Sequence, residues 1–454
     1  MSKSQGSPLW DRGTPLDQVV ATFTVGRDPE LDGALAAYDA LGSAAHASML
    51  RQIGILSQED HEALTTELRA IAEQARAGAF EVAPADEDCH TAIENRLTQK
   101  LGDAGRRIHT GRSRNDQVIA MLRLFGREAL AAQFRATVEL AEQLFSLAET
   151  HRDVAVAGYT HTRQAMPSTF GLFFGAHAEL QVDNLSWLRT AFDHLDRCPL
   201  GSASGYGVAL GLDRQLVSDL LRFSRVQLNT LAVQNDRGKS ESLALCAVAT
   251  VVSDLGRLAS DLIWFSTEEL GYVALDESIT TGSSIMPQKR NPDVLELIRA
   301  TAAQLRSRQA EAAQLYGGLL SGYHRDMQWT KAPFVEGLRD GLRATQAMQR
   351  ALCNLTIDAE ACRRAMKRAI GATDALYQRV QAGQPFRAAY KAIAAAPDSA
   401  VTGDPAEAWR ARDHLGAPAN LQLDAGRQRL ADQRCWLEDT EKRLNSAWDL
   451  LFAD

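Results

Sequence analysis

The sequence lacks the features that direct a protein to nucleic acid, to a membrane or to an oxidising compartment. Its 49 Lys and Arg residues against 57 Asp and Glu residues give a net charge of -8, whereas nucleic acids and anionic membranes bind broad positive surfaces. No apolar run reaches the roughly 18 residues that cross a membrane, and the N-terminal MSKSQGSPLW has no apolar signal-peptide core. We therefore expect a cytoplasmic protein that binds neither nucleic acid nor membrane.

Two further absences concern cofactors. The six cysteines form no C-x-x-C pair, so we expect neither a disulfide framework nor a structural zinc site. The glycine-rich stretch GSASGYGVALG (201–211) is not G-x-G-x-x-G and follows no strand, so it does not predict a dinucleotide site. We interpret it as an irregular crossover between long helices.

Long segments without proline are abundant instead. Residues 116–151 contain no proline and a single glycine, and their apolar residues recur at helical spacing. Similar segments cover 167–196, 239–270 and 292–316. Helices of this length usually pack side by side as a bundle. Several carry apolar residues on more than one face, as in 249–258, so we expect copies of the chain to bury these faces against each other.

These segments predict an all-α fold with three helical parts. An N-terminal domain that carries active-site loops would span 1–112, and a central long-helix bundle would span 113–364. A small helical C-terminal domain would span 365–454, where shorter helices and loops replace the long ones. Convincing strands are scarce, and we interpret the apolar stretch 154–159 as a connector.

Two loops have both a structural and a functional interpretation. In HTGRSRNDQ (109–117), Asn115 or Asp116 could simply cap the long helix that follows. Alternatively, the guanidinium groups of Arg112 and Arg114 and the free N–H groups of the helix start could bind a carboxylate. In AGYTHTRQAMPS (157–168), Thr160 and His161 precede a helix that Pro167 would open, and a lone histidine is more often structural than catalytic.

The loop TTGSSIMPQKRNPD (280–293) is the most unusual stretch. Asn291 followed by Pro292 and an acidic residue matches a helix start, so capping could explain Asn291. Capping does not explain residues 282–284, which can present successive N–H groups to an anion, nor the nearby Lys289. This arrangement suits negative charge that develops on a carboxylate. A fourth polar stretch, SGYHRDMQWTKAP (321–333), could be a turn between helices.

In this order, these segments resemble the aspartase/fumarase superfamily. GSSIMPQKRNPD is similar to its signature loop, and HTGRSRNDQ with the Thr-His pair resembles its argininosuccinate lyase branch. The similarity extends through AAYDALGSAAHASML (36–50), DEDCHTAIENRL (86–97), ATDAL and QPFRAAYKA. The resemblance implies a homotetramer with a twenty-helix core whose active sites take loops from three subunits. It also implies reversible cleavage of argininosuccinate to arginine and fumarate, without cofactor or metal.

The resemblance assigns roles to residues of this chain. Ser283 would be the base, made usable by an electropositive, dehydrated loop. Lys289 and Asn291 would hold the aci-carboxylate intermediate. His161 would accept a proton, orient a group or act as an acid. Substrate would be bound at its fumarate end by Arg114, Asn115 and Thr160, and at its arginine end by Tyr323, Gln328 and Lys331.

The chain departs from the family at three places. Gly26, in FTVGRDPELD (23–32), stands where many relatives have a substrate-binding serine, and Asp28 or backbone groups could substitute for it. Met166 replaces a glutamine, and Trp329 with Thr330 replaces acidic residues.

Alternative functions remain open at this point. An adenylosuccinate lyase would need a phosphate site, and the HTGRSRND loop does not favour it. A structural protein on the same fold, as some lens crystallins are, would not need the retained Ser283, Lys289, Asn291 and His161. A helical scaffold without chemistry leaves loop 280–293 unexplained.

Overall fold

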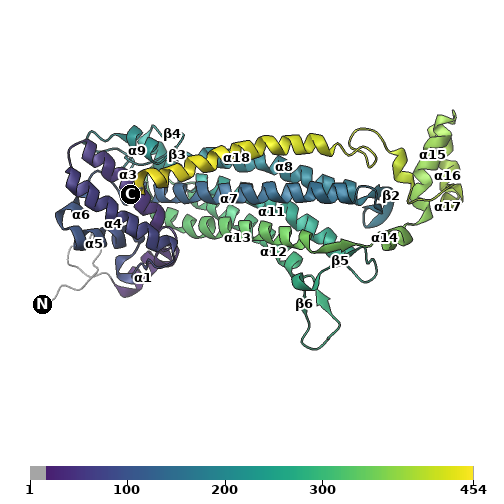
Figure 1. Cartoon of the computed structure of the whole chain (residues 1–454), viewed down its shortest axis with the longest axis horizontal. Helices are drawn as coiled ribbons and strands as arrows, with labels where there is room; N and C mark the ends of the chain where they lie inside the picture. The colour runs from purple at the N-terminus through teal and green to yellow at the C-terminus, as the bar shows by residue number, and fades with distance from the viewer. Residues whose placement is uncertain (1–16, 453–454) are drawn as a thin grey trace.

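The computed structural model describes residues 17–452, and it shows an elongated helical molecule with a lobe at each end of a bundle (Figure 1). The N-terminal lobe packs mainly around α3, whose small residues allow close helix contacts. Its elements are α1 (Gln18–Val25), α2 (Asp28–Asp32), α3 (Ala36–Gln52), α4 (Gln58–Arg76), η1 (Pro84–Asp86), α5 (Cys89–Leu101) and α6 (Asp103–Arg107). The prediction that the N-terminus lacks a signal-peptide core concerns residues 1–10, which lie outside the described residues.

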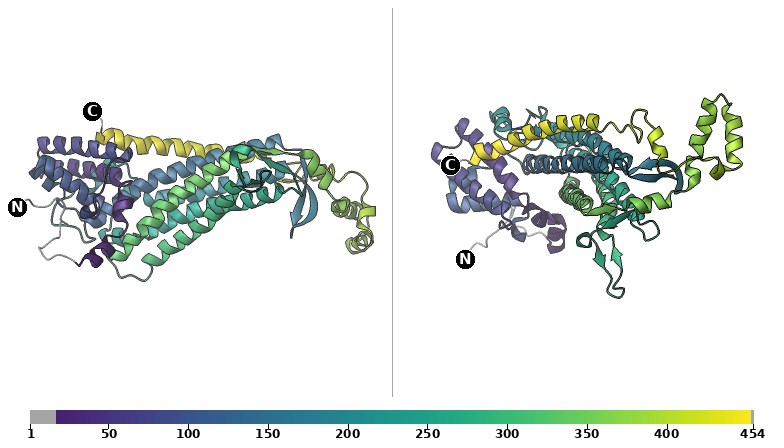
Figure 2. Two further views of the ribbon diagram at one scale, coloured as in Figure 1. Left: turned by 90° about the horizontal axis from the view of Figure 1, so that it is seen from below. Right: turned by 45° about the vertical axis from the view of Figure 1, so that its right-hand side comes forward.

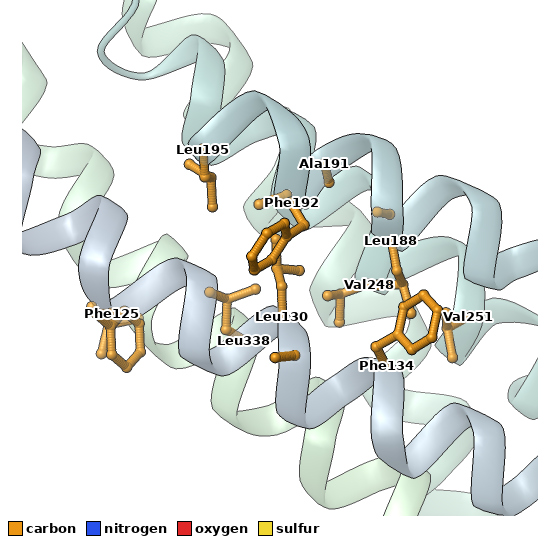
Figure 3. Close-up of a cluster of buried hydrophobic side chains, with 14 of the residues drawn as sticks. Phe125, Leu130, Phe134, Leu188, Ala191, Phe192, Leu195, Val248, Val251 and Leu338 are labelled. Carbon is orange, nitrogen blue, oxygen red and sulfur yellow. The ribbon is translucent and has the colours of Figure 1, made fainter. Parts of the chain in front are cut away.

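The predicted long helices are confirmed, and they run side by side along the middle of the molecule (Figures 1 and 2). They are α7 (Arg114–Thr150), α8 (Phe170–Leu195), α11 (Lys239–Phe265) and α12 (Asp293–Tyr316). A fifth long helix, α13 (Lys331–Cys353), joins them and was not among the predicted segments. Apolar side chains from α7, α8, α11 and α13 meet between them (Figure 3). The helices α11 and α13 approach so closely that a Cβ on Gly341 would lie 2.1 Å from Cγ1 of Val248. A side chain larger than hydrogen therefore cannot occupy that position without moving a helix.

The connector interpretation of 154–159 is wrong. β1 (Ala155–Thr160) pairs antiparallel with β2 (Arg163–Thr169) in a hairpin at the far end of the bundle. Pro167 lies within β2 and does not open a helix; α8 starts at Phe170, where the Thr169 hydroxyl caps it by accepting from Leu172 N. Pro is compatible with this strand because a two-stranded ribbon leaves the outer side of each strand unpaired.

The remaining elements are short. Strands β3 (Arg197–Cys198) and β4 (Arg225–Val226) pair, as do β5 (Val273–Leu275) with β8 (Leu355–Ile357), and β6 (Thr281–Gly282) with β7 (Arg290–Asn291). Between the long helices lie α9 (Arg214–Leu220), α10 (Thr230–Asn235), η2 (Glu277–Ile279) and η3 (Arg325–Thr330). As predicted, 201–211 is an irregular crossover.

The far lobe contains small helices, and the chain then returns to the bundle. The lobe consists of α14 (Ala359–Ala365), η4 (Arg368–Gly371), α15 (Ala372–Gln381), α16 (Phe386–Ala394), α17 (Pro397–Ala400) and η5 (Ala408–Ala411). α18 (Leu423–Phe452) runs back along α7 and α8 to the N-terminal lobe (Figure 1). α18 belongs to the predicted C-terminal domain but packs along helices of the predicted central domain. The domain boundaries at 112 and 364 stay a prediction.

Among the described residues, α11 is the one helix that is long and apolar enough to cross a membrane. Two thirds of its most apolar window, 67%, is buried inside the bundle, as expected for the core helix of a soluble protein. All six cysteines are unpaired.

Candidate active site

The start of α7 presents Arg114 and Asn115 on its first turn. Ser113 caps the helix, with its hydroxyl accepting from Asn115 N at 3.3 Å, and Ser113 N donates to the Asp116 carboxylate at 3.0 Å. The prediction that Asn115 or Asp116 is the cap is therefore wrong, because a capping box needs its acid on the third helical residue. Since the Asn115 side chain is not used for capping, it is available to a ligand.

The charge of Arg114 is partly balanced by the N-terminal lobe. Its guanidinium donates to Thr91 Oγ1 at 2.6 Å and lies 3.4 Å from Glu87 and 3.3 Å from Asp88. Arg112, by contrast, donates to the Ser43 hydroxyl at 2.8 Å and supports the lobe. Of the two arginines in this loop, Arg114 is therefore the better candidate for a carboxylate.

Asp116 fixes the crossover 201–211 onto this helix start. Its carboxylate accepts from Gly201 N at 3.1 Å and from Ala203 N at 2.8 Å, in addition to Ser113 N. Burial raises the pKa of Asp116 to about 6, although these N–H groups favour the charged form. The crossover and the start of α7 therefore form one rigid unit.

The segment around η3 lies at the same end of the bundle and holds Tyr323, Gln328 and Lys331. The Gln328 amide donates to the carbonyls of Thr24 at 3.1 Å and Val25 at 3.0 Å, close to Gly26. Tyr323 is 36% exposed, whereas Lys331 is almost completely buried. The Gln328 amide therefore joins η3 to the N-terminal lobe.

Lys331 and Arg114 are connected through that lobe. The Lys331 ammonium lies 2.6 Å from Asp32 and 3.1 Å from Asp28. Asp32 also accepts from Cys89 N at 3.1 Å, and Cys89 follows Asp88, which faces Arg114. A single chain therefore brings the predicted residues Arg114, Asn115, Tyr323, Gln328 and Lys331 to one end of the bundle.

Thr160 and His161 lie at the opposite end, on the β1–β2 hairpin (Figure 1). His161 and Thr162 form its two-residue turn with φ values of 52° and 58°, a conformation that usually requires Asn or Gly. The hairpin is anchored by Gln164, which donates to Ala365 O at 2.7 Å, and by the Tyr159 hydroxyl, 2.8 Å from that of Tyr272. His161 is exposed at the tip.

The signature loop projects from the bundle between β6 and β7 (Figure 1). The Ser283 hydroxyl accepts from Met286 N at 3.2 Å and Ile285 N at 3.4 Å. Such N–H donors favour negative charge on that oxygen. Lys289 is exposed, and no hydrogen bond or ion pair engages its ammonium within residues 17–452. The loop thus combines a hydroxyl with N–H donors and an available cation.

The capping interpretation of Asn291 is wrong. Asn291 belongs to β7, and its amide donates at 3.5 Å to Thr281 Oγ1 and to Gly282 O across the hairpin. α12 begins after Pro292 without any side-chain cap. Asn291 is therefore held at the base of the loop that carries Ser283 and Lys289.

These groups of residues do not meet within one chain. α7 has 37 residues, which at 1.5 Å per residue is about 55 Å, and it separates Arg114 from the hairpin with His161. No small substrate spans that distance. The loop with Ser283, Lys289 and Asn291 projects away from both ends (Figures 1 and 2).

Sequence reasoning missed Arg237 and Asp32. Arg237 is buried, and its guanidinium lies 5.5 Å from the centre of the Tyr323 ring. The sequence signal for Arg237 was the charged pair Asp236-Arg237 directly before the most apolar long helix. Charged residues in such a position are rarely buried unless another group pairs with them.

Comparison with known proteins identifies the family. A family model described as lyase matches residues 13–306. The chain is 44% identical over 423 residues to an argininosuccinate lyase of Xanthomonas campestris pv. campestris (strain B100), covering 93% of this chain and 98% of that relative. It is 42% identical over 422 residues to an argininosuccinate lyase of Sorangium cellulosum (strain So ce56), with the same coverage of 93% and 98%. The chain therefore belongs to this lyase family. Within the family, its relatives put it with the argininosuccinate lyases.

Solved structures share the fold. A crystal structure of EDDS lyase in complex with formate matches with a TM-score of 0.81 at 24% identity, covering 96% of this chain and 97% of that chain. At this identity the likeness concerns the fold alone.

Proposed function

We propose that the protein is a cytoplasmic enzyme of arginine biosynthesis that cleaves argininosuccinate reversibly to arginine and fumarate. The observation that carries the proposal is the 44% identity to an argininosuccinate lyase over 93% of the chain. The loop geometry supports it, because a hydroxyl, N–H donors and a cation lie on one projecting segment. The reaction needs no cofactor or metal in this proposal.

In the proposed mechanism, Ser283 removes the proton from the carbon next to the substrate carboxylate. The resulting aci-carboxylate carries two negative oxygens, and Lys289 and Asn291 hold them. The bond to the guanidine nitrogen then breaks, its electrons stay with that nitrogen, and the carbon–carbon double bond of fumarate forms. His161 either exchanges a proton with the leaving nitrogen or orients the base.

The remaining residues bind the substrate. Arg114, Asn115 and Thr160 hold the carboxylates of the fumarate end, because forked guanidinium, amide and hydroxyl donors suit carboxylate oxygens. Tyr323, Gln328 and Lys331 line the arginine end.

We further propose that the active enzyme is a homotetramer. Five long helices from each of four copies would form a twenty-helix core and bring the separated groups of residues together. An exposed apolar face supports this assembly: Trp187 of α8 is 61% exposed and Leu243 of α11 is 41% exposed. Both line a hollow of about 550 Å³, and such a patch on a soluble protein usually contacts a partner.

The proposal is tested by mixing purified protein with argininosuccinate and following fumarate by its ultraviolet absorbance. Release of fumarate and arginine in equal amounts is expected. Adenylosuccinate serves as the competing substrate. Turnover of adenylosuccinate without turnover of argininosuccinate would reverse the assignment, and a folded tetramer that turns over neither would indicate a structural protein.

A further inference from the structure

One face of α3 packs against the loop 109–113, which leads into α7. Ser43 and His46 lie one helical turn apart on this face and are 1% and 0% exposed. The Ser43 hydroxyl accepts from the Arg112 guanidinium at 2.8 Å. The His46 Nε2 lies 2.9 Å from the carbonyl oxygen of Thr110. Two side chains of one helix therefore hold two points of the loop.

The surroundings of His46 determine which ring nitrogen carries the proton. Burial, together with the positive charge of Arg112, holds the pKa of His46 well below its usual range, so the ring is neutral. Since a carbonyl oxygen only accepts hydrogen bonds, the proton is on Nε2, which donates to Thr110 O. The other nitrogen, Nδ1, is buried without a partner among residues 17–452. The hydrogen bond that this ring makes is therefore directed at the loop.

The backbone of the loop forms two tight turns in series. In the first, Thr110 N donates to Arg107 O at 3.0 Å. In the second, Arg112 N donates to His109 O at 3.1 Å, and Gly111 between the two turns has a φ of 75°. These bonds are local, so they fix the shape of the loop but not its position relative to the N-terminal lobe. The side chains of α3 contribute that position.

The position of the loop decides where the candidate substrate ligands lie. Ser113 ends the loop and caps α7, and Arg114 and Asn115 are the first two residues of that helix. Hydrogen bonds to a carboxylate tolerate only small changes of distance and angle. A displacement of about 1 Å can cost on the order of 100-fold in rate, even when its cause lies away from the reacting atoms.

We propose that Ser43 and His46 are positioning residues for the fumarate end of the substrate. They hold the loop that places Arg114 and Asn115, and both are too deeply buried to touch the substrate themselves. The inference rests on the proposed function, because it assumes that the start of α7 binds the carboxylates of that end.

Binding of the two products to the intact oligomer tests the proposal. His46→Leu removes the donor to Thr110 O, so fumarate should bind about tenfold more weakly. Arginine should bind within about twofold of its normal affinity, because the candidate residues for its end lie around η3. His46→Gln, whose amide can still donate, should recover most of the loss. A variant that only weakened the fold would leave the ratio of the two affinities unchanged.

His61 of α4 provides a matched control. Its Nε2 lies 2.9 Å from the Ser48 hydroxyl, which is also on α3, and its Nδ1 is likewise buried without a partner among the described residues. This bond joins α4 to α3 and involves no residue of the loop. His61→Leu should therefore leave the affinities for fumarate and arginine within about twofold of normal.

Ser43→Ala is an independent second variant. It removes the acceptor of the Arg112 guanidinium, so it should also weaken fumarate binding selectively, and it carries the test if His46→Leu does not fold. Unchanged fumarate binding in the folded variants would overturn the proposal. An equal loss for both products, or the same selective loss in His61→Leu, would also overturn it.

Amide hydrogen exchange in residues 109–113 tests the support of the loop without any ligand. Exchange should be faster in His46→Leu than in His61→Leu, and equal rates would contradict the role of His46. Failure of the proposed function is distinguishable, because the unmodified protein would then not cleave argininosuccinate, whereas the exchange rates would still show whether His46 holds the loop.

Discussion

At the scale of single residues, the hairpin tip holds His161 in an unfavourable backbone conformation. His161 and Thr162 both have positive φ, which costs of order 1 kcal/mol or more for a residue with a Cβ. The turn persists because β1 and β2 are paired on both sides of it. Backbone strain of this kind often accompanies functional positions, which agrees with the proposed role of His161.

Thr162→Gly is therefore expected to stabilise the hairpin. Glycine adopts positive φ without a steric penalty, which stabilises the turn. The variant also loses the hydrogen bond that the Thr162 hydroxyl donates to His161 O, which partly offsets this gain. The net free energy of unfolding should rise by about 0.5 kcal/mol. The thermal midpoint measures the change. Thr160→Gly, two residues earlier in the extended backbone of β1, is the control and should lower the midpoint. A lower midpoint for Thr162→Gly as well would contradict the account.

Ser283→Ala is expected to abolish most of the turnover without affecting assembly. Loss of a general base costs roughly 100- to 10,000-fold in rate, and Ser283 is on a projecting loop outside the core. Initial rates of fumarate formation and the sedimentation of the variant measure both effects. The exposed neighbour Ser284, changed to Ala, should remain close to normal. Near-normal rates for Ser283→Ala would assign the base to His161 or another group.

At the scale of secondary-structure elements, Asp236 links four segments around the buried core. Its carboxylate lies 2.8 Å from Arg123 of α7, 2.8 Å from Arg197 of β3 and 3.2 Å from His194 of α8, and Ser240 of α11 donates to it at 2.5 Å. Burial alone would raise the pKa of Asp236, but hydrogen bonding to His194 and the charge of Arg123 hold it well below its usual range.

Asp236→Asn should therefore destabilise the fold in a pH-dependent way. Loss of the charge removes the counterion of the buried Arg123 and of the partly buried Arg197, which costs about 3 kcal/mol at neutral pH. Because the folded pKa is strongly depressed, this contribution is fully present above the unfolded pKa of about 4 and is lost progressively as pH falls toward the folded pKa. The difference in thermal midpoint between the two proteins should therefore be smaller near pH 3 than at neutral pH. The exposed Asp449→Asn is the control, and an equal difference at both pH values would refute the assignment.

The helices could be predicted from the sequence, but the ends of several elements could not. Segments such as 116–151 repeat apolar residues over many turns, so periodicity alone identifies them. The hairpin was missed because its turn uses His161 and Thr162 in place of Asn-Gly, and because Pro167 suggested a helix start. The sequence also allows Asn291 to be a helix cap, because cap and strand residues look alike without the pairing partner, Thr281. Arg237 was missed because burial of a charge depends on contacts between distant segments.

At the scale of the whole molecule, the geometry of a single chain leaves the proposed site incomplete. The residues at the start of α7 and around η3 lie at one end of the bundle, and His161 lies past the other end, about 55 Å away by the length of α7. The loop with Ser283 and Lys289 projects sideways. The central claim is therefore that neighbouring copies supply the missing groups.

Complementation between two inactive variants tests this claim most directly. Ser283→Ala and Asn115→Ala are each expected to be nearly inactive, but refolding them together in equal amounts should restore about a quarter of normal activity. Random mixing leaves that share of sites with an intact loop from one copy and an intact helix start from another. Ser283→Ala mixed with Lys289→Met should restore nothing, because both lesions lie on the same loop. If the first mixture forms hybrid oligomers and stays as inactive as the second, the shared-site account is contradicted.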